Sequence, residues 1–202
     1  MKFLTPLFSI FVLLMLPLLM TAQSGRADEP LRVYKSGQLD ARVGIGVLPT
    51  YLADRNRVEQ AFPAIYAALD YRLTDNFTLG AYYGRSDSET IEYIFSDGVR
   101  GSWLNNTQTY GLRAAFHLSD KVKNADFYGG FTIGRTKALI DCSDPTMERM
   151  QRYMGIEAIN SRTVMSGFLG GAYTFTKRFG AFAEIGAGGI ALARAGVNVR
   201  IF

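Results

Sequence analysis

The sequence predicts an all-β fold, an eight-stranded antiparallel up-and-down β-barrel that spans a membrane, and three observations support this prediction. Segments in which apolar and polar residues alternate recur along the chain, and a two-residue period is typical of β-strands. The connections between these segments are mostly short and long in turn, as in barrels whose strands cross a bilayer. Aromatic residues lie near the segment ends on the apolar side, where membrane barrels have their interfacial girdles.

Eight segments show the alternation, and none has a clear helical period. They cover residues 39–49, 63–73, 77–86, 107–118, 126–136, 162–175, 179–188 and 192–202. The connections after the second, fourth and sixth segments are short, with the sequences TDN, SDKVKNA and TKR. Those after the first, third and fifth are long and cover about 50–62, 87–106 and 137–161. The short seventh connection breaks this pattern. The short turns are expected on the periplasmic side, together with both ends of the barrel.

The two faces of each segment differ in polarity. In the fourth segment Tyr110, Leu112 and Phe116 share one face, and Arg113 and His117 share the other. A sheet with one wet face also alternates, so alternation alone does not decide the environment. Aromatic residues near the segment ends favour a bilayer; they are Phe77, Tyr110, Phe116, Phe127 and Phe179. A closed barrel would satisfy every backbone polar group and explain how an exported chain manages with one cysteine, Cys142.

The N-terminal residues have the features of a secretory signal peptide. Lys2 precedes an almost wholly apolar stretch, residues 3–20, which is followed by the small and polar residues TAQSGRADEP. We therefore expect residues 1–24 to be removed, with cleavage between 22 and 27, residues 25–37 to form a short N-terminal segment, and residues 38–202 to form the barrel. The alternative is a retained transmembrane anchor, because the apolar stretch nearly reaches spanning length.

The last segment ends in an alternating pattern. Val197, Val199 and Ile201 share one parity, whereas Asn198 and Arg200 share the other. This pattern predicts that the last strand closes the barrel against the first, with its apolar side toward lipid. Phe202 follows Ile201 and so falls on the wrong parity for a lipid-facing residue. It requires an irregularity in the strand, or it points inward or past the rim.

Three stretches have a resemblance to a known family: YGLRAAFHL at 110–118, FTKRFGAFAEIG at 175–186, and FAEIGAGGIALARAGVNVRIF at 182–202. The sequence resembles the small eight-stranded outer-membrane barrels, such as outer membrane protein X and the barrel of outer membrane protein A. It is most similar to porin-family "outer membrane beta-barrel domain" proteins of Bacteroidetes. The resemblance covers about residues 38–202 and implies a Gram-negative outer membrane, contact with outer-membrane lipid, and insertion by the barrel assembly machinery. Proteins of this type usually end on a lipid-facing aromatic residue, from which Phe202 departs.

Several charged residues fall on the inward parity. They are Arg42, Asp70, Arg72, Arg113, Glu184 and Arg200. Eight strands enclose a lumen that side chains can fill, and buried charges must be paired. We therefore interpret these six as a structural network of ion pairs, and we expect no pore.

His117 also admits a catalytic interpretation. His117 and Ser119 form a His-x-Ser pair on one parity, and lipid A deacylases are small barrels with such a pair and a carboxylate partner. Here the carboxylate would have to come from Glu184, Asp120 or Asp126. Asp120 stands where that family has Asn, so we favour a histidine at the periplasmic rim over a catalytic one.

The long connections are the expected place for recognition, since loops on a rigid scaffold commonly bind partners. Alternation within 87–106 predicts that strands three and four continue past the membrane as a hairpin tipped by SDGVRG, and a short helix is expected at about 146–154. Tyr93, Phe95 and Trp103 would be displayed there as contacts for an unidentified surface ligand or partner protein.

The function expected from the sequence is that of an integral outer-membrane barrel with a structural or surface-interaction role and no enzymatic activity. One alternative is an enzyme acting on outer-leaflet lipid. The other is a soluble lipocalin-like binder of an apolar ligand, which would require the apolar parity to face inward. One His and one Cys suggest no metal or cofactor, and the dispersed charges suggest no nucleic-acid partner.

Overall fold

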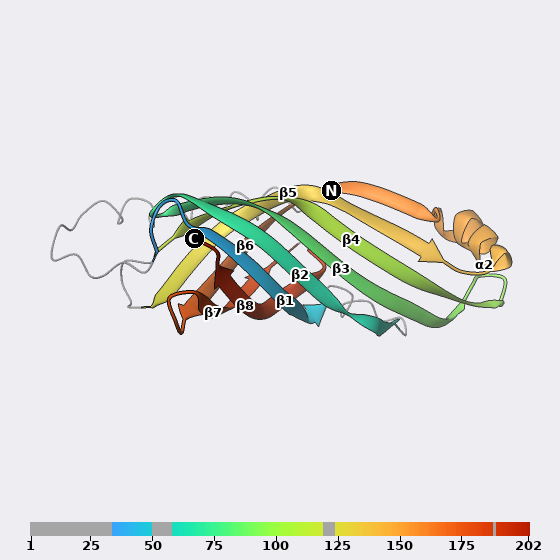
Figure 1. The fold of residues 1–202 in the computed structure, drawn as a ribbon. Coiled ribbons are helices and arrows are strands. Elements are labelled where there is room, and N and C mark those ends of the chain that lie inside the picture. Colours follow the sequence, from blue (N-terminus) through green and yellow to red (C-terminus); the bar gives the residue numbers. More distant parts are fainter. Residues whose placement is uncertain (1–33, 50–57, 119–123, 188) are drawn as a thin grey trace.

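Eight antiparallel strands form a closed barrel in which each strand pairs with its neighbours in sequence and β8 returns to pair with β1 (Figure 1). This computed structural model describes residues 34–49, 58–118, 124–187 and 189–202. The predicted fold class is confirmed. Within the described residues no helix is long and apolar enough to cross a membrane. The strands are β1 Leu39–Pro49, β2 Val58–Thr74, β3 Phe77–Ile94, β4 Arg100–His117, β5 Ala125–Asp141, β6 Ile159–Thr174, β7 Phe179–Gly186 and β8 Ala191–Arg200.

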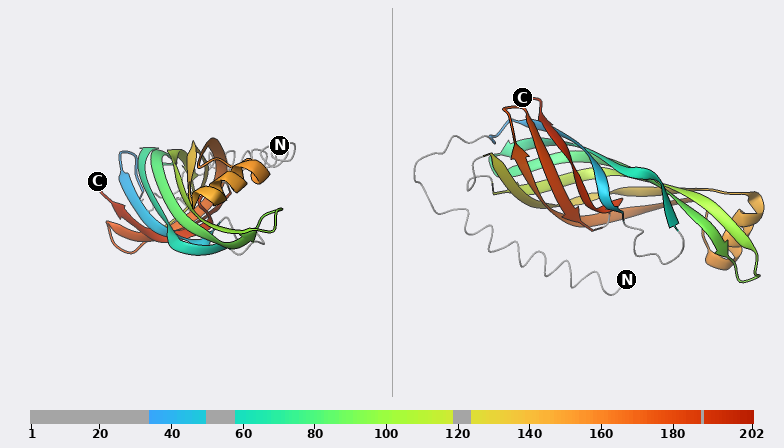
Figure 2. Two further views of the ribbon diagram at one scale, coloured as in Figure 1. Left: turned by 90° about the vertical axis from the view of Figure 1, so that its right-hand side faces the viewer. Right: turned by 90° about the horizontal axis from the view of Figure 1, so that it is seen from below.

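The strands differ greatly in length. Strands β2 to β6 have 16 to 18 residues, whereas β1, β7 and β8 have 11, 8 and 10. A tilted strand of about 9–11 residues crosses the hydrocarbon layer, so the longer strands exceed what a bilayer requires. Their excess lies at one end, where it forms a protruding sheet that carries a helix (Figures 1 and 2).

The protruding sheet corrects several predicted boundaries. Strands β2, β4 and β6 begin earlier than predicted, and β3 and β5 end later, at Ile94 and Asp141. Within 87–106 the alternation predicted that strands three and four continue as a hairpin, and β3 and β4 do so. Of the connection predicted at 137–161, only 137–141 and 159–161 are strand. Alternation is weak there because neither face of this part of the sheet is uniformly apolar.

The outward and inward faces agree with the predicted assignment. Val43 and Leu112 point outward and are 60% and 57% exposed, whereas Arg113 on the opposite parity is 2% exposed. Tyr66 and Phe168 contribute to an interior aromatic core. A lipocalin-like binder would need the reverse arrangement, so the alternative with an inward apolar face is wrong.

Pairing of β1 with β8 closes the barrel. Gly44 and Gly196 face each other in this seam, and a Cβ on Gly196 would collide with the backbone of β1. Strand β8 ends at Arg200 rather than at Phe202, although the Phe202 carbonyl still accepts a hydrogen bond from the Leu39 N–H at 3.0 Å. The Phe202 side chain lies past the end of the strand and is 66% exposed, which accounts for its parity.

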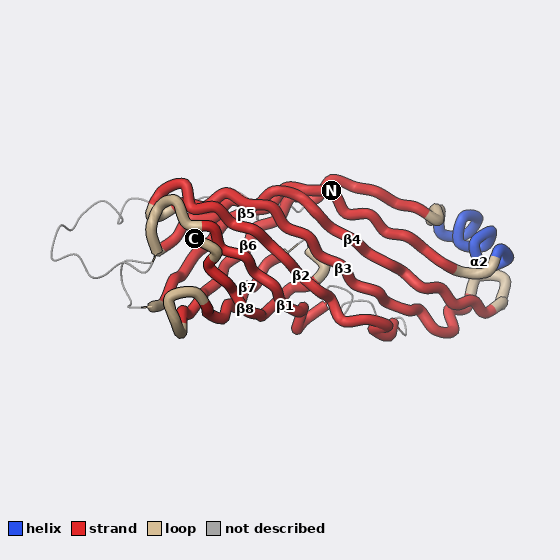
Figure 3. Tube along the Cα trace, viewed as in Figure 1, coloured by secondary structure: helices blue, strands red, loops and turns tan. Residues whose placement is uncertain are grey.

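The tip of the protruding sheet has the predicted hairpin and helix. A turn connects β3 to β4, with Gly98 at φ +80°. Helix α2 Asp144–Arg149 continues into a single wider turn, η2 Met150–Met154, between β5 and β6 (Figure 3). Gly155 ends it in the left-handed conformation at φ +65°, which glycine adopts without steric cost.

Candidate functional sites in the lumen and at the tip

Glu184 on β7 is the centre of an ion-pair cluster in the lumen. Its Oε1 lies 2.9 Å from Arg42 Nη1 and 2.8 Å from Arg113 Nη2, and its Oε2 lies 2.6 Å from Arg194 Nε. The Tyr128 hydroxyl donates a further hydrogen bond to Oε1 at 2.9 Å. One carboxylate thus joins three arginines from three different strands, which is the pairing that buried charges require.

Asp70 on β2 completes this cluster. Its two carboxylate oxygens lie 3.2 Å from Arg42 Nε and 3.2 Å from Arg113 Nε. The two guanidinium groups also lie over aromatic faces, Arg42 over Tyr128 and Arg113 over Phe168, each 4.5 Å from the ring centroid. Arginine suits this setting because its planar group pairs with a carboxylate and stacks on a ring at once.

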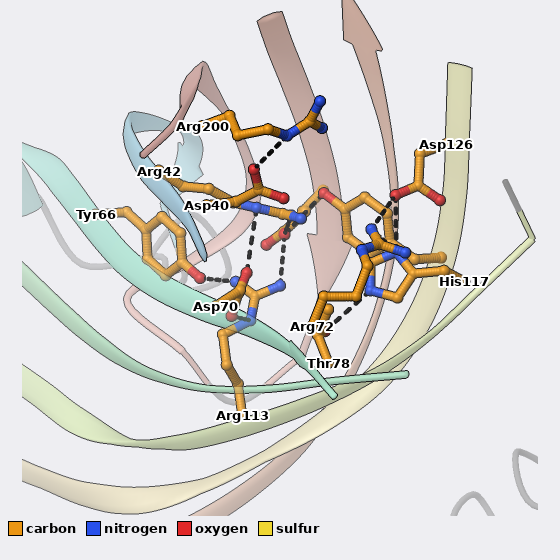
Figure 4. Close-up of polar contacts among 12 residues, drawn as sticks. Asp40, Arg42, Tyr66, Asp70, Arg72, Thr78, Arg113, His117, Asp126 and Arg200 are labelled. Carbon is orange, nitrogen blue, oxygen red and sulfur yellow. Dashed lines mark hydrogen bonds and ion pairs between the residues drawn. The ribbon is translucent and has the colours of Figure 1, made fainter. Parts of the chain in front are cut away.

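A second polar cluster lies nearer the short turns and includes His117 (Figure 4). Asp126 Oδ2 is 3.0 Å from Arg72 Nη2 and 2.8 Å from His117 Nδ1, and Thr78 Oγ1 is 2.9 Å from His117 Nε2. A proton on Nδ1 lets the ring donate to Asp126 and accept from the Thr78 hydroxyl. Ser119, the other member of the predicted catalytic pair, lies outside the described residues.

The hydroxyl of Thr78, the imidazole of His117 and the carboxylate of Asp126 contact one another in the order of a hydrolytic triad. Their surroundings, however, do not suit catalysis. Thr78, His117 and Asp126 are each at most 2% exposed, and a nucleophile must reach its substrate. Asp126, one of the three carboxylates considered from the sequence, contacts His117, whereas Glu184 belongs to the other cluster. The arrangement fixes three strands to one another.

The segment before β1 lies across the end of the lumen at the short turns. The Tyr34 hydroxyl is 2.6 Å from Thr174 Oγ1, and its ring has the Arg72 and Arg200 guanidinium groups 5.0 and 4.9 Å from its centroid. Arg200 also pairs with Asp40, with 3.4 Å between Nε and Oδ1. Side chains therefore fill this end of the barrel.

At the opposite end, aromatic residues of the hairpin gather under the helix and form a small core of their own. The ring centroid of Tyr93 lies 5.2 Å from that of Phe95 and 5.4 Å from that of Trp103. Phe95 also contacts Tyr153 of η2, with 6.4 Å between centroids, and Met150 is fully buried. Phe95 itself is buried, so of the three predicted contact residues it supports the fold of this tip rather than being displayed.

An ion pair fastens the helix to the hairpin. Asp97 in the turn accepts a hydrogen bond from Arg149 Nε at 3.0 Å and another from the Val99 N–H at 3.1 Å. Cys142 lies in the connection between β5 and α2 and is partly buried. Burial and the neighbouring Asp141 and Asp144 raise the pKa of its thiol, so the thiol stays protonated at neutral pH. We call this unit of hairpin, α2 and η2, residues 92–103 and 144–154, the cap.

Comparison with solved structures identifies the architecture. The N-terminal β-barrel domain of Pseudomonas aeruginosa OprF matches with a TM-score of 0.50 and 16% identity, over 83% of this chain and 99% of that one. OprG, an outer membrane protein of Pseudomonas aeruginosa, matches with a TM-score of 0.52 and 12% identity, over 85% and 99%. The chain has the fold of a small outer-membrane β-barrel. Ail, the attachment invasion locus protein of Yersinia pestis, matches less well, with a TM-score of 0.45 and 11% identity over 82% and 95%.

These likenesses concern the fold of the outer-membrane barrels alone. No protein-family model matches the chain, and no curated protein matches its sequence. The resemblance to Bacteroidetes porin-family proteins therefore stays a prediction.

The lumen holds all six charged residues that the sequence placed there, and the described part of the chain adds three more. Arg42, Asp70, Arg72, Arg113 and Glu184 are buried, and the Arg200 side chain is 10% exposed. The additional members are Asp40, Asp126 and Arg194. Each lies on the inward parity of its strand, so the alternation itself was the signal that would have found them. Among the described residues no group of three or more His, Cys, Asp or Glu side chains could hold a metal.

Proposed function

We propose that the chain is an integral outer-membrane barrel of a Gram-negative bacterium, inserted by the barrel assembly machinery, whose cap serves a surface-interaction role. The short turns face the periplasm and the protruding sheet extends outside the cell. The observation on which this rests is the combination of an apolar outer wall with strands that continue far beyond it into a folded cap.

The outer wall supports the membrane position. Large apolar side chains such as Leu79, Leu112, Ile133 and Leu169 point outward from successive strands and are all about half exposed. A contiguous apolar surface of this extent is unfavourable in water, whereas a bilayer removes it from solvent. Backbone pairing around the closed barrel leaves no edge within the wall.

The cap supports the surface role. Its packed aromatic rings, the ion pair between Asp97 and Arg149, and the buried Met150 hold it in one conformation, so binding would cost little ordering entropy. It also exposes Ile94, Val99 and Tyr153, which are 59%, 40% and 42% accessible. Apolar side chains displayed on a rigid, protruding unit are typical of a contact surface.

The edge of the protruding sheet offers a second means of contact. Within the described part of the chain, residues 159–166 of β6 pair only with β5, because β7 pairs with β6 from Phe168 onward. An exposed strand edge presents backbone donors and acceptors that an extended peptide can pair with.

Cell fractionation tests the membrane position. The protein is expected in the outer-membrane fraction, and it should migrate differently on a gel before and after boiling because the closed barrel resists detergent. External protease on intact cells should cleave the cap and leave the barrel. A soluble periplasmic protein, or a cap that protease cleaves in lysed cells but not in intact cells, would contradict the proposal.

The surface role is tested separately with a double variant, Ile94→Ser and Val99→Ser, which leaves the aromatic contacts of the cap in place. We expect cells with this variant to adhere less to protein-coated surfaces while the barrel stays heat-modifiable. Unchanged adhesion would leave the protein with a structural role in the membrane. No observation favours the enzymatic alternative, since the only imidazole is buried.

A further inference from the structure

Three basic side chains lie together on the outer wall, immediately above its apolar part. The register places Tyr83, Tyr110 and Arg135 side by side on β3, β4 and β5. Two residues further along each strand toward the cap, Arg85, Gln108 and Lys137 form the next row. All six share the outward parity of their strands, as the exposed rings of Tyr83 and Tyr110 show.

The charges of this group are only partly neutralised. Arg85 pairs with Asp87 at 2.9 Å, and Asp87 also accepts a hydrogen bond from Asn106 Nδ2 at 2.6 Å. Arg135 and Lys137 form no ion pair with any described residue. They differ in this from the lumen arginines, each of which faces a carboxylate.

The group occupies one side of the barrel. Toward the cap ends of β7 and β1, on the other side of the barrel, the outward residues Ile185 and Val47 are apolar and about 60% exposed. Within the described residues, the basic side chains of the group therefore have no counterpart on β1 or β7. They mark the wall from which the protruding sheet rises.

Directly below the group the wall is apolar. Leu112 pairs with Ile133 one row beneath Tyr110 and Arg135, and both side chains point outward. A molecule that covered both regions would need an anionic head and hydrocarbon chains. This is the chemistry of a phosphorylated lipid at the level of its headgroup, since basic side chains form strong charge-assisted hydrogen bonds with phosphate.

We propose that Arg135 and Lys137, with Arg85 and Gln108 at their side, form a binding site for the phosphate group of a phosphorylated lipid in the outer leaflet. The acyl chains of that lipid lie along Leu112 and Ile133. This inference rests on the proposed function, because it requires the protruding sheet to be on the outer side of the membrane. Tyr83 and Tyr110 place their phenol groups at the same boundary, as interfacial tyrosines do.

The test uses the full barrel in nanodiscs of phosphatidylcholine with a minor fraction of bis-phosphorylated lipid A. Native mass spectrometry counts the lipid A molecules retained by the protein, and a titration gives their affinity. The matched control for Arg135→Gln with Lys137→Gln is Lys177→Gln with Arg178→Gln. That pair is exposed at the short-turn end and loses the same charge.

We expect the Arg135 and Lys137 variant to bind about thirty-fold more weakly, because each basic residue near an anionic surface contributes a factor of about five. The control pair should bind as the unsubstituted protein does. Dephosphorylated lipid A should not be retained by either. Equal retention by both variants, equal retention of dephosphorylated lipid A, or equally potent competition by inorganic phosphate would each overturn the proposal.

Heat-modifiability in the same nanodiscs separates the two proposals. A chain that does not insert as a heat-modifiable barrel contradicts the proposed function. A chain that inserts, but whose Arg135 and Lys137 variant keeps its lipid A, contradicts only this binding site.

Discussion

Glu184 and Arg113 join opposite walls of the barrel. Oε1 of Glu184 on β7 accepts a hydrogen bond from Nη2 of Arg113 on β4 at 2.8 Å, although these strands are not neighbours in the sheet. The contact crosses the lumen instead of following the wall. It therefore resists a deformation that backbone pairing alone would permit, the flattening of the barrel.

Replacing Glu184 with Gln should destabilise the barrel strongly. Three arginines would lose their shared carboxylate, and removing one partner of a buried ion pair typically costs about 3–5 kcal/mol. Urea unfolding of the barrel in lipid vesicles measures the loss. Glu157→Gln, in an exposed connection, is the control and should leave the free energy of unfolding unchanged. Equal stability of the two variants would contradict the central role of Glu184.

Substituting His117 with Ala should lower stability without changing the lipid composition of the outer membrane. The variant leaves the Thr78 hydroxyl without its partner and Asp126 with Arg72 alone, at a cost of about 1–3 kcal/mol for the buried groups. Unfolding measurements give the stability, and mass spectrometry of extracted lipid gives the composition. A changed lipid pattern with an intact barrel would revive the enzymatic alternative.

Met150→Asp should unfold the cap and spare the barrel. Met150 is fully buried inside the cap, and an unpaired charge cannot be accommodated there. Protease should then cleave within residues 141–158 much faster, while the shift on a gel before and after boiling persists. Met154→Asp is the matched control, since Met154 is 37% exposed. Similar cleavage of both variants would show that the cap has no core.

Gly196→Val should prevent closure of the barrel. Any Cβ at this position collides with the β1 backbone at Val43 and Gly44, and backbone atoms cannot move aside as a flexible side chain can. The variant is expected to remain unfolded after refolding in detergent, as seen by the loss of the gel shift. Gly171→Val provides the comparison, because the nearest atom to a Cβ at Gly171 would be in the Phe127 ring, at an ordinary contact distance of 3.5 Å. A heat-modifiable Gly196→Val barrel would place the seam elsewhere.

The attachment of the helix to the hairpin should weaken in acid. The hydrogen bond from the Val99 N–H, with a further contribution from Arg149, holds the pKa of Asp97 below its usual range. A lowered pKa means that the folded cap favours the charged carboxylate. The contribution of the Asp97 carboxylate to the stability of the cap is complete above the ordinary Asp pKa of about 3.9. It is lost as pH falls through the lower pKa of the folded state. The protection of the α2 amides, measured against their intrinsic exchange rates at each pH, should therefore fall in this range, and Asp97→Asn should remove this loss of protection.

The membrane-embedded half of the fold could be predicted from sequence because a bilayer imposes alternation. In β4 the outward Leu112 and the inward Arg113 differ sharply in polarity. The strand agrees with the predicted segment 107–118 in the half that contains them. Its other half contains Asn105, Asn106 and Thr107, in which successive residues have similar polarity. The sequence therefore indicates that β4 continues toward the hairpin, but not that it begins at Arg100.

In the lumen, the sequence predicts which side chains face inward but not which of them are in contact. Parity predicted that Arg42 and Glu184 both face inward, but not that they touch. Their contact depends on the stagger between β1, β7 and β8, which a single sequence does not specify. Arg194 shares the parity of Asn198 and Arg200, so the same alternation places it inward. The cap core, with Phe95 buried under η2, arises between two connections that no local pattern links.

Closure of the seam between β1 and β8 has a kinetic consequence. Pairings from β1 through β8 each join neighbours in the sequence and can form as soon as both strands are present. The seam joins the first strand to the last, so its formation has the largest loop-closure entropy cost. It cannot form before residues 191–200 are in place. During that interval β1 keeps an open edge, which makes the nearly complete barrel the state most exposed to aggregation.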